Sequence, residues 1–172
     1  NSDVLPGLLL SGSISGAGTL FGKSGTGTAL LTNASNSFGG TLALIDIQGG
    51  YLAVPNDGAL GNAANQIRLS TNSATQGLRV AGSFSTLRTL VLNAANNAVD
   101  VTGGNLLTLT TPFQLVSSTY NLAKNDNGIL LLTANNGSWN GSVIVNAGAV
   151  RVGTSTAVGT GSLFISPNVN AS

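Results

Sequence analysis

Apolar residues alternate with polar or small residues in short runs along most of the chain. This is the pattern of β-strands, in which successive side chains point to opposite sides and residues i and i+2 share a face. We expect the residues between such pairs, among them Arg68, Arg79, Asp100, Thr108 and Arg151, to point outward. The pairs predicted to point inward are Leu42/Leu44, Leu52/Val54, Ile67/Leu69, Leu78/Val80, Leu90/Leu92, Val99/Val101, Leu107/Leu109, Phe113/Leu115, Leu130/Leu132, Val143/Val145, Val150/Val152 and Leu163/Ile165.

The segments between these pairs are short and rich in Asn and Gly, and no stretch shows a 3.6-residue apolar stripe. They leave no room for a helix between strands, so we predict almost no α-helix. Asn and Gly both tolerate the left-handed conformation that a tight corner needs. Asn side chains could also stack into a ladder, but left-handed corner geometry is the simpler interpretation.

One unit of sequence occurs twice, at 23–42 and again at 124–143, without a gap. Internal repetition in a Gly/Asn/Thr-rich chain favours stacked coils, each of which buries its apolar face against its neighbours. Sandwich and barrel folds stay open on the strand pattern alone. The repeat favours a right-handed parallel β-helix, with residues 1–172 as one segment and coils of about 20–25 residues that carry three strands each. The repeated residues are Lys23, Gly27, Leu30, Leu31, Thr32, Ser37 and Gly40, which recur as Lys124, Gly128, Leu131, Leu132, Thr133, Ser138 and Gly141, with Phe38 matched by Trp139.

The composition narrows the classes of protein and partner. Only 6% of the residues are charged while 42% are hydrophobic, which excludes a disordered chain. No apolar run reaches the length of a membrane span, and Leu5–Leu10 has neither the length nor the basic flank of a signal peptide. The six cations are scattered, so we predict no nucleic-acid partner.

Few residues could carry catalysis, because the chain has no His and no Cys. A polysaccharide-cleaving site would need two carboxylates facing one groove. Asp100 lies between two valines and should point outward, whereas Asp46 lies between two isoleucines but in phase with Leu42 and Leu44. We predict no enzyme, no catalytic pair and no cofactor. The carboxylates are Asp3, Asp46, Asp57, Asp100 and Asp126.

Three other features have structural interpretations that we favour over functional ones. Asp57 and Asp126 lie in turn sequences, and the nonapeptide that binds calcium in β-rolls is absent, so we predict no metal site. The segment 17–24 fits a relaxed phosphate-loop spacing, but a turn and a strand follow it rather than a helix. Phe38 and Trp139 share a repeat position, which favours packing at a corner over stacking on a sugar or a partner.

The repeated unit resembles the autotransporter-associated β-strand repeat, also called the passenger-associated transport repeat. The resemblance lies in a Leu-Leu-Thr strand, an Asn-x-aromatic segment followed by Gly, and a closing Gly-x-Leu-x-Val strand. Each copy continues into a similar segment, and with these segments the two copies cover about 16–70 and 121–166. Three features depart from the family pattern. The first copy has a short insertion before Gly50. The second copy has Asp126 and Asn127 where Gly is usual, and its sequence at 140–142 also differs from the usual one. The structural residues of the motif are Lys23, Gly27, Thr32, Phe38, Gly40, Lys124, Gly128, Thr133, Trp139 and Gly141.

The resemblance implies a bacterial type V secretion passenger, at the cell surface or secreted, carried by a C-terminal outer-membrane β-barrel outside this chain. In that case the segment supports secretion and folding of the passenger, and its partners are the neighbouring coils. Two alternatives stay open: an adhesin segment that binds host or bacterial surface ligands, and a fragment of a β-helical polysaccharide-degrading enzyme. The open coil at each end also predicts end-to-end self-association or a cap.

Overall fold

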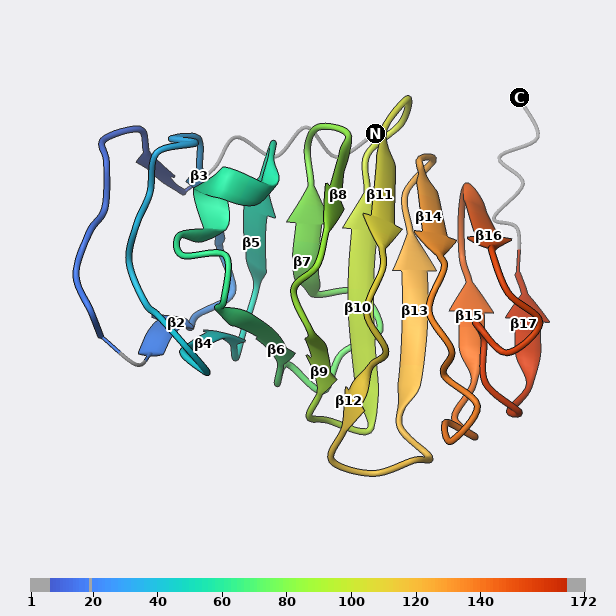
Figure 1. The fold of residues 1–172 in the computed structure, drawn as a ribbon. Helices are drawn as coiled ribbons and strands as arrows, with labels where there is room; N and C mark the ends of the chain where they lie inside the picture. The colour runs from blue at the N-terminus through green and yellow to red at the C-terminus, as the bar shows by residue number, and fades with distance from the viewer. Residues whose placement is uncertain (1–6, 19, 167–172) are drawn as a thin grey trace, which may run out of the picture.

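The fold is a stack of coils, seen in a computed structural model that describes residues 7–18 and 20–166 (Figure 1). The described residues form 17 strands and one short 3₁₀ helix, η1 (Asp57–Leu60), and they contain no α-helix. Every strand pairing is parallel and joins a strand to one in the next coil. This confirms the parallel β-helix and excludes the sandwich and the barrel. No helix in the described part has the length and apolar character needed to cross a membrane.

The strands form three sheets, A, B and C, on different faces of the stack. Sheet A runs through all the described coils, whereas sheet B covers the earlier coils and sheet C the later ones. Sheet A contains β1 (Leu8–Leu10), β3 (Thr28–Leu31), β5 (Tyr51–Val54), β7 (Gly77–Val80), β10 (Asn96–Val101), β13 (Asn121–Asn125), β15 (Val143–Val145) and β17 (Leu163–Ile165). Sheet B contains β2 (Leu20–Lys23), β4 (Leu44–Ile47), β6 (Gln66–Leu69), β9 (Leu90–Leu92) and β12 (Gln114–Leu115). Sheet C contains β8 (Phe84–Thr86), β11 (Leu106–Leu109), β14 (Ile129–Leu132) and β16 (Ala149–Val152).

The coils vary in length and in the number of strands. Register partners in sheet A lie between 20 residues apart, at Val145 and Ile165, and 26 residues apart, at Leu52 and Leu78. This range agrees with the predicted coil size. The prediction of three strands in every coil is wrong, because the described coils before β7 use sheets A and B and the last coils use sheets A and C. At the sheet C position of one early coil, η1 takes the place of a strand.

The core is a set of columns inside the coils, formed by residues that hold the same position in successive coils. In β5, β7 and β10 the predicted pairs Leu52/Val54, Leu78/Val80 and Val99/Val101 are buried and point inward. Each methylene buried in such a column contributes about 0.8 kcal/mol to the stability of the folded chain. One inner column of sheet A, followed by register, is Ala29, Leu52, Leu78, Val99, Lys124, Val145 and Ile165.

The pair Leu42/Leu44 does not point inward, so this prediction is wrong. Leu42 has a positive φ of 61° and is 70% exposed. This left-handed residue shifts the phase of the alternation just before β4, so that Ile45 and Ile47 fill the core and Leu44 lies on the outer face. The same shift settles the direction of Asp46, which points outward.

The corners do not depend on left-handed Asn, contrary to the interpretation from sequence. Among the described non-glycine residues with positive φ, Asn72 is the only asparagine; the other two are Leu42 and Asp126. Buried Asn side chains instead bond to backbone groups of the coils above and below. Asn36 Oδ1 accepts from Ile14 N at 2.8 Å, and its Nδ2 donates to Ala59 O at 2.9 Å.

Both described ends of the stack expose apolar side chains. At the C-terminal end Leu163, Phe164 and Ile165 of β17 are exposed beside an apolar cavity of about 330 Å³. At the other end Leu8 and Leu9 of β1 are exposed. Because sheet A is parallel throughout, the free edge of β17 has the strand direction needed to pair with β1 of a second copy.

We therefore expect the chain to associate end to end as its concentration rises. Leu163→Lys should shift the population toward the monomer, because it places a charge on the apolar end face. Leu87→Lys is the matched control, since Leu87 is 80% exposed but follows β8, away from β1 and β17. Sedimentation equilibrium over a wide concentration range measures both. A strictly monomeric parent chain would contradict the expectation.

Candidate functional site

The two repeated lysines point into the core, where their ammonium groups bind corner carbonyls. Lys124 is fully buried, and its Nζ donates to the carbonyls of Asn125 at 2.5 Å, Asp126 at 2.7 Å and Ala147 at 3.3 Å. The Lys23 ammonium donates in the same way to Ser24, Gly25 and Gly49, at 2.7 to 2.9 Å. In both cases two acceptors belong to the corner that follows the lysine and the third to the corner of the next coil. An ammonium has three donors, so one side chain can satisfy all three carbonyls.

The two copies of this lysine corner occupy different faces of the stack. Lys23 ends β2 in sheet B, whereas Lys124 lies in β13 of sheet A. Followed by register through sheet B, the column of Lys23 reaches Leu115 four coils later. Lys124 comes one strand after Leu115 along the chain. The sequence repeat is therefore offset by four coils and one face.

The backbone of the two lysine corners also matches. Gly25 has a φ of 75° and the equivalent Asp126 has a φ of 63°, so the Asp that departs from the family pattern keeps the left-handed conformation. Gly50 and Gly148 occupy the corner of the next coil, both with positive φ. A Cβ at either position would lie 2.2 Å from a carbonyl oxygen of the corner below, so the stacking requires glycine there.

Burial lowers the pKa of both lysines. For Lys124 it lowers the pKa to about 8, against the smaller opposing effects of the negative charges of Asp126 and Asp100. For Lys23, which is less deeply enclosed, burial also lowers the pKa. The three carbonyl acceptors hold each ammonium in place despite this desolvation. Since the Lys23 ammonium binds carbonyls of the chain itself in the corners that follow β2 and β4, Lys23 caps a corner and does not act as the lysine of a phosphate loop.

The other motif residues support the same stacking to different degrees. The backbone N–H groups of Thr32 and Thr133 donate to the coil before, each at 3.1 Å. A Cβ at Gly128 would lie 2.5 Å from Thr102 O. Around Gly27 and Gly40 the space is open, so no close contact requires glycine at these two positions.

Phe38 and Trp139 are buried, as their repetition predicts. Phe38 stacks on Phe21 with ring centroids 4.7 Å apart, and Trp139 meets Phe113 edge-on at 5.2 Å. The Trp139 Nε1 also donates to Tyr120 O at 2.6 Å. A Cβ at Gly141 would lie 2.0 Å from that same carbonyl, so Gly141 gives the indole the room to reach it. Neither ring offers an exposed surface to a sugar.

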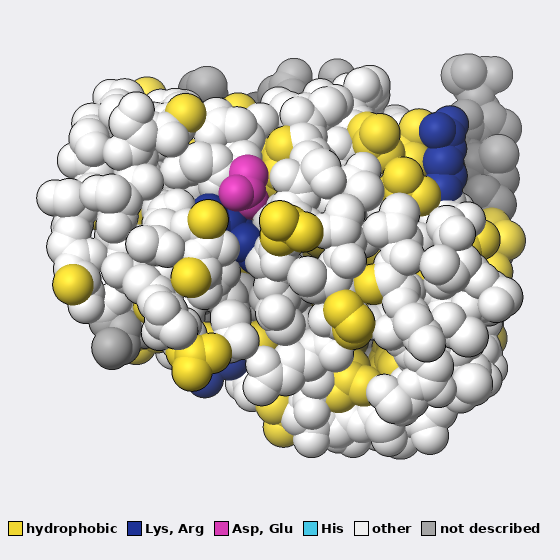
Figure 2. All heavy atoms as spheres, in the orientation of Figure 1, with side chains coloured by type: hydrophobic (Ala, Val, Ile, Leu, Met, Phe, Trp, Pro, Cys, Tyr) yellow, Lys and Arg dark blue, Asp and Glu magenta, His cyan; other side chains and the backbone are white. Residues whose placement is uncertain are grey.

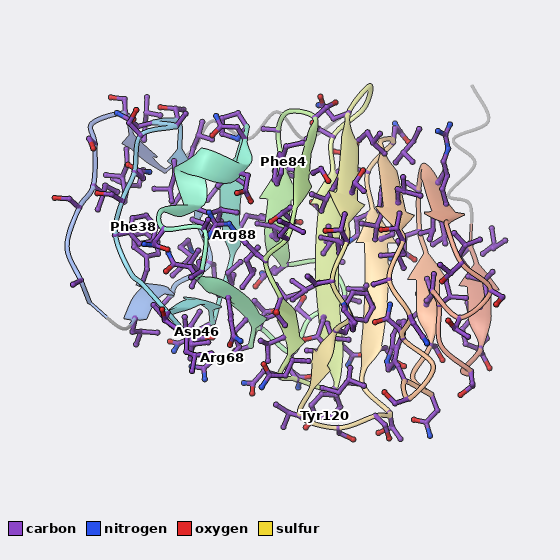
Figure 3. All side chains as sticks on the ribbon, viewed as in Figure 1. Phe38, Asp46, Arg68, Phe84, Arg88 and Tyr120 are labelled. Atoms are coloured by element: carbon purple, nitrogen blue, oxygen red, sulfur yellow. The ribbon has the colours of Figure 1, made fainter. Side chains whose placement is uncertain are left out.

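In the part of the chain that the structure describes, three ion pairs join different coils, and two of them contain the carboxylates considered for catalysis. On the outer face of sheet B, Asp46 accepts from Arg68 Nη2 at 2.6 Å, and Figure 3 shows the two side chains together outside β4 and β6. On the outer face of sheet A, Asp100 accepts from Arg79 Nη2 at 3.1 Å. The buried Arg88 forms the third pair, with Asp57 at 2.9 Å. In the space-filling view charged groups are sparse on the face shown (Figure 2).

The environments of Asp46 and Asp100 shift their pKa values in opposite directions. Burial alone would raise the pKa of Asp46, but hydrogen bonds from Arg68, Ser70 and Gln48 together lower it. Burial raises the pKa of Asp100 and outweighs the hydrogen bonds and the positive charge of Arg79 that lower it. The two carboxylates lie on different sheets and do not face one groove.

A strap formed by residues 71–76 covers the Asp100 side of sheet A. Asn125 Nδ2 donates to Ala74 O at 2.8 Å, and the Tyr51 hydroxyl donates to Thr75 O. Gly50 N donates to Gln76 Oε1 at 3.1 Å. Asp100 points away from the core, as predicted, but the strap leaves it only 3% exposed. The sequence pattern contains no signal for this cover.

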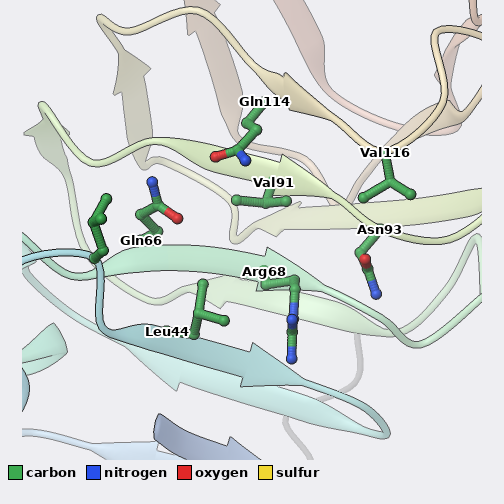
Figure 4. Close-up of a pocket in the computed structure, with 8 residues that line it drawn as sticks. Leu44, Gln66, Arg68, Val91, Asn93, Gln114 and Val116 are labelled. Atoms are coloured by element: carbon green, nitrogen blue, oxygen red, sulfur yellow. The ribbon is translucent and has the colours of Figure 1, made fainter. Parts of the chain in front are cut away.

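A shallow groove of about 370 Å³ runs over the outer face of sheet B (Figure 4). It crosses β4, β6, β9 and β12, with Arg68 and the amides of Gln66, Asn93 and Gln114 between apolar walls. Within the described part of the chain, the side-chain amides of Gln66 and Gln114 form no hydrogen bond, while Asn93 Nδ2 donates to Ser70 Oγ at 3.0 Å. Asp46 neutralises Arg68, so the groove as a whole is nearly uncharged.

The described residues contain no group of three or more His, Cys, Asp or Glu side chains that could hold a metal ion. Comparison of the chain with protein-family models, with curated proteins and with solved structures gave no significant match. The candidate sites are therefore defined by geometry alone. They are the two lysine corners and the sheet B groove.

The lowered pKa of Lys124 predicts a pH dependence of stability. Between about pH 8 and the ordinary lysine pKa of 10.5, the unfolded chain binds a proton that the folded chain has lost. The free energy of unfolding should therefore rise with pH in this window, by at most about 1.4 kcal/mol per pH unit. Chemical denaturation at pH 7.5, 8.5 and 9.5 measures this slope, most of which Lys124→Met should lose.

Lys23→Met is the matched control for this measurement, because Lys23 carries the same three carbonyl contacts but is less enclosed. It should keep most of the slope. The prediction is wrong if the free energy of unfolding changes with pH equally in the parent chain and in Lys124→Met. The ammonium of Lys124 would then titrate in the folded chain as it does in the unfolded chain.

Proposed function

We propose that this chain is a non-enzymatic structural segment of a bacterial autotransporter passenger, which supports secretion of the passenger and its folding at the cell surface. The observation that carries the proposal is the lysine corner, which occurs twice at the positions where the sequence resembles the passenger-associated repeat. Its function is to lock one coil onto the next. The proposal places the chain at the surface or in the secreted fraction, upstream of an outer-membrane β-barrel.

The mechanism is folding by addition of coils. Each folded coil presents a row of backbone N–H and C=O groups, an inner apolar column and the carbonyls of its corners. The next coil binds all three features in register, so each folded coil templates its successor. Such a process needs no other energy source and proceeds as the chain emerges. The inter-coil ion pairs and the two lysine corners favour one register over its neighbours.

Deletion of one whole coil from the full precursor tests this mechanism. Deletion of 122–142 joins Asn121 to Val143, the register partner of Leu122, so β15 replaces β13 with its inward residues unchanged. We expect surface display and protease resistance to be retained at a reduced level, because the coils still stack in register while Val145 takes the place of Lys124 and Ala147 O loses its donor. Deletion of 122–131 removes part of a coil, shifts the faces and should abolish both. Equal display of the two deletions would contradict a role for coil stacking in secretion.

The groove on sheet B favours a second candidate function, that of an adhesin segment. Its unpaired Gln66 and Gln114 amides, its neutralised Arg68 and its apolar walls fit an uncharged ligand with hydroxyl or amide groups, such as a host or bacterial surface glycan. Each side-chain amide supplies both a donor and an acceptor, so it can bind hydroxyl groups. No step of the folding mechanism uses these two side chains.

The double variant Gln66→Ala/Gln114→Ala separates the two functions. If the groove binds a surface ligand, adhesion of displaying cells should fall several-fold while display stays unchanged, because each lost hydrogen bond is worth about 1 kcal/mol. The matched control is Ser85→Ala/Thr108→Ala, on the outer face of sheet C. Unchanged adhesion in both variants would show that the groove does not bind the surface ligand.

A further inference from the structure

Three Asn–Gly dipeptides occur in the second half of the chain, at 127–128, 136–137 and 140–141. In such a dipeptide the backbone nitrogen of Gly can attack the side-chain amide carbon of Asn, and ammonia leaves as a five-membered succinimide forms. Water then opens the ring to aspartate or isoaspartate. Glycine favours the attack because it has no Cβ to restrict the backbone. The folded structure must leave the Gly nitrogen free and the Asn side chain mobile.

The structure blocks the attack at Asn127. Its side chain is exposed, but Gly128 N donates to Val101 O at 2.8 Å, so the nitrogen is held in the stacking ladder. Attack at this dipeptide requires the coil to open.

The structure blocks the attack at Asn136 in two ways. The side chain is buried and bridges coils: its Oδ1 accepts from Phe113 N and its Nδ2 donates to Ala157 O, both at 2.8 Å. In addition, Gly137 N donates to Asn135 Oδ1 at 2.8 Å. Neither reacting group is free while the coils stay stacked.

Asn140 differs from both. Its side chain is exposed and forms no hydrogen bond within the described part of the chain, and there Gly141 N–H donates to no acceptor. The Asn140 N–H donates to Ser118 O at 2.9 Å, which fixes the backbone before the reacting pair and leaves the side chain free to turn. We propose that Asn140–Gly141 is a site of spontaneous deamidation in the folded protein.

The two products should affect the stack differently. Aspartate adds one negative charge at an exposed position and keeps the backbone unchanged. Isoaspartate adds a methylene to the backbone beside Gly141, where even a Cβ would lie 2.0 Å from Tyr120 O. That carbonyl also accepts the hydrogen bond of Trp139 Nε1. The isoaspartate form should therefore unfold at a lower temperature than the aspartate form.

Peptide mapping by mass spectrometry of the folded chain, aged in mildly alkaline buffer, tests the proposal. The peptide with Asn140 should gain the mass of an amide-to-acid change at least about tenfold faster than the peptides with Asn127 and Asn136, whose reaction needs local opening. Isoaspartate-specific methylation identifies the second product. In denaturant the three sites should react at similar rates, because only the fold distinguishes them.

Asn140→Gln is the matched variant, because it keeps the amide but cannot form the five-membered ring. It should lose the fast reaction and gain none at the other two dipeptides. The proposal is overturned if Asn127 or Asn136 reacts as fast as Asn140 in the folded chain. It is also overturned if Asn140 reacts only when the chain is denatured.

Discussion

The stack depends on how the corners satisfy their carbonyl groups. A coil that turns tightly leaves carbonyls that cannot all join the ladder between strands, and each buried acceptor without a donor costs about 1–3 kcal/mol. Lys23 and Lys124 solve this from inside the core, with one ammonium for two carbonyls of its own corner and one of the next. An aliphatic residue would suit the column better and leave all three acceptors unpaired. Desolvation of Lys124, seen in its lowered pKa, is the cost of this arrangement.

The few charged side chains of the chain also help to hold neighbouring coils in register. Asp46 with Arg68 and Asp100 with Arg79 occupy equivalent outward positions in neighbouring strands, so each pair forms only when the two coils are in register. Buried pairs add little net stability, but an unpaired partner would be costly, which penalises a slipped register. Both carboxylates are thereby held by structural contacts on separate sheets. This distribution of charge is the strongest physical argument for a structural role.

Much of this architecture follows from the sequence, and what does not has identifiable causes. The alternation around Leu52 and Val99 is enough to predict the strands and their inward residues. Leu44 breaks the prediction because a left-handed residue at 42 shifts the phase, and no local signal marks a leucine for that conformation. The strap over Asp100 is held by Asn125, which lies two coils further along the stack than the strap residue Ala74 that it binds. The recurrence of lysine was a visible signal, but alternation alone does not show that an inward position can hold an ammonium.

The offset of the repeat by four coils and one face shows which part of the sequence forms the structural unit. A unit tied to one face would recur only after whole coils, and Lys124 would then lie in sheet B. The lysine corner instead needs an inward lysine near the end of a strand, a left-handed residue after it, and a glycine in the corner of the next coil. Any face that supplies these parts can carry it, so coils of different length can follow one another without loss of stacking. A chain built from such corners can extend one coil at a time, because each addition needs only the corner beneath it.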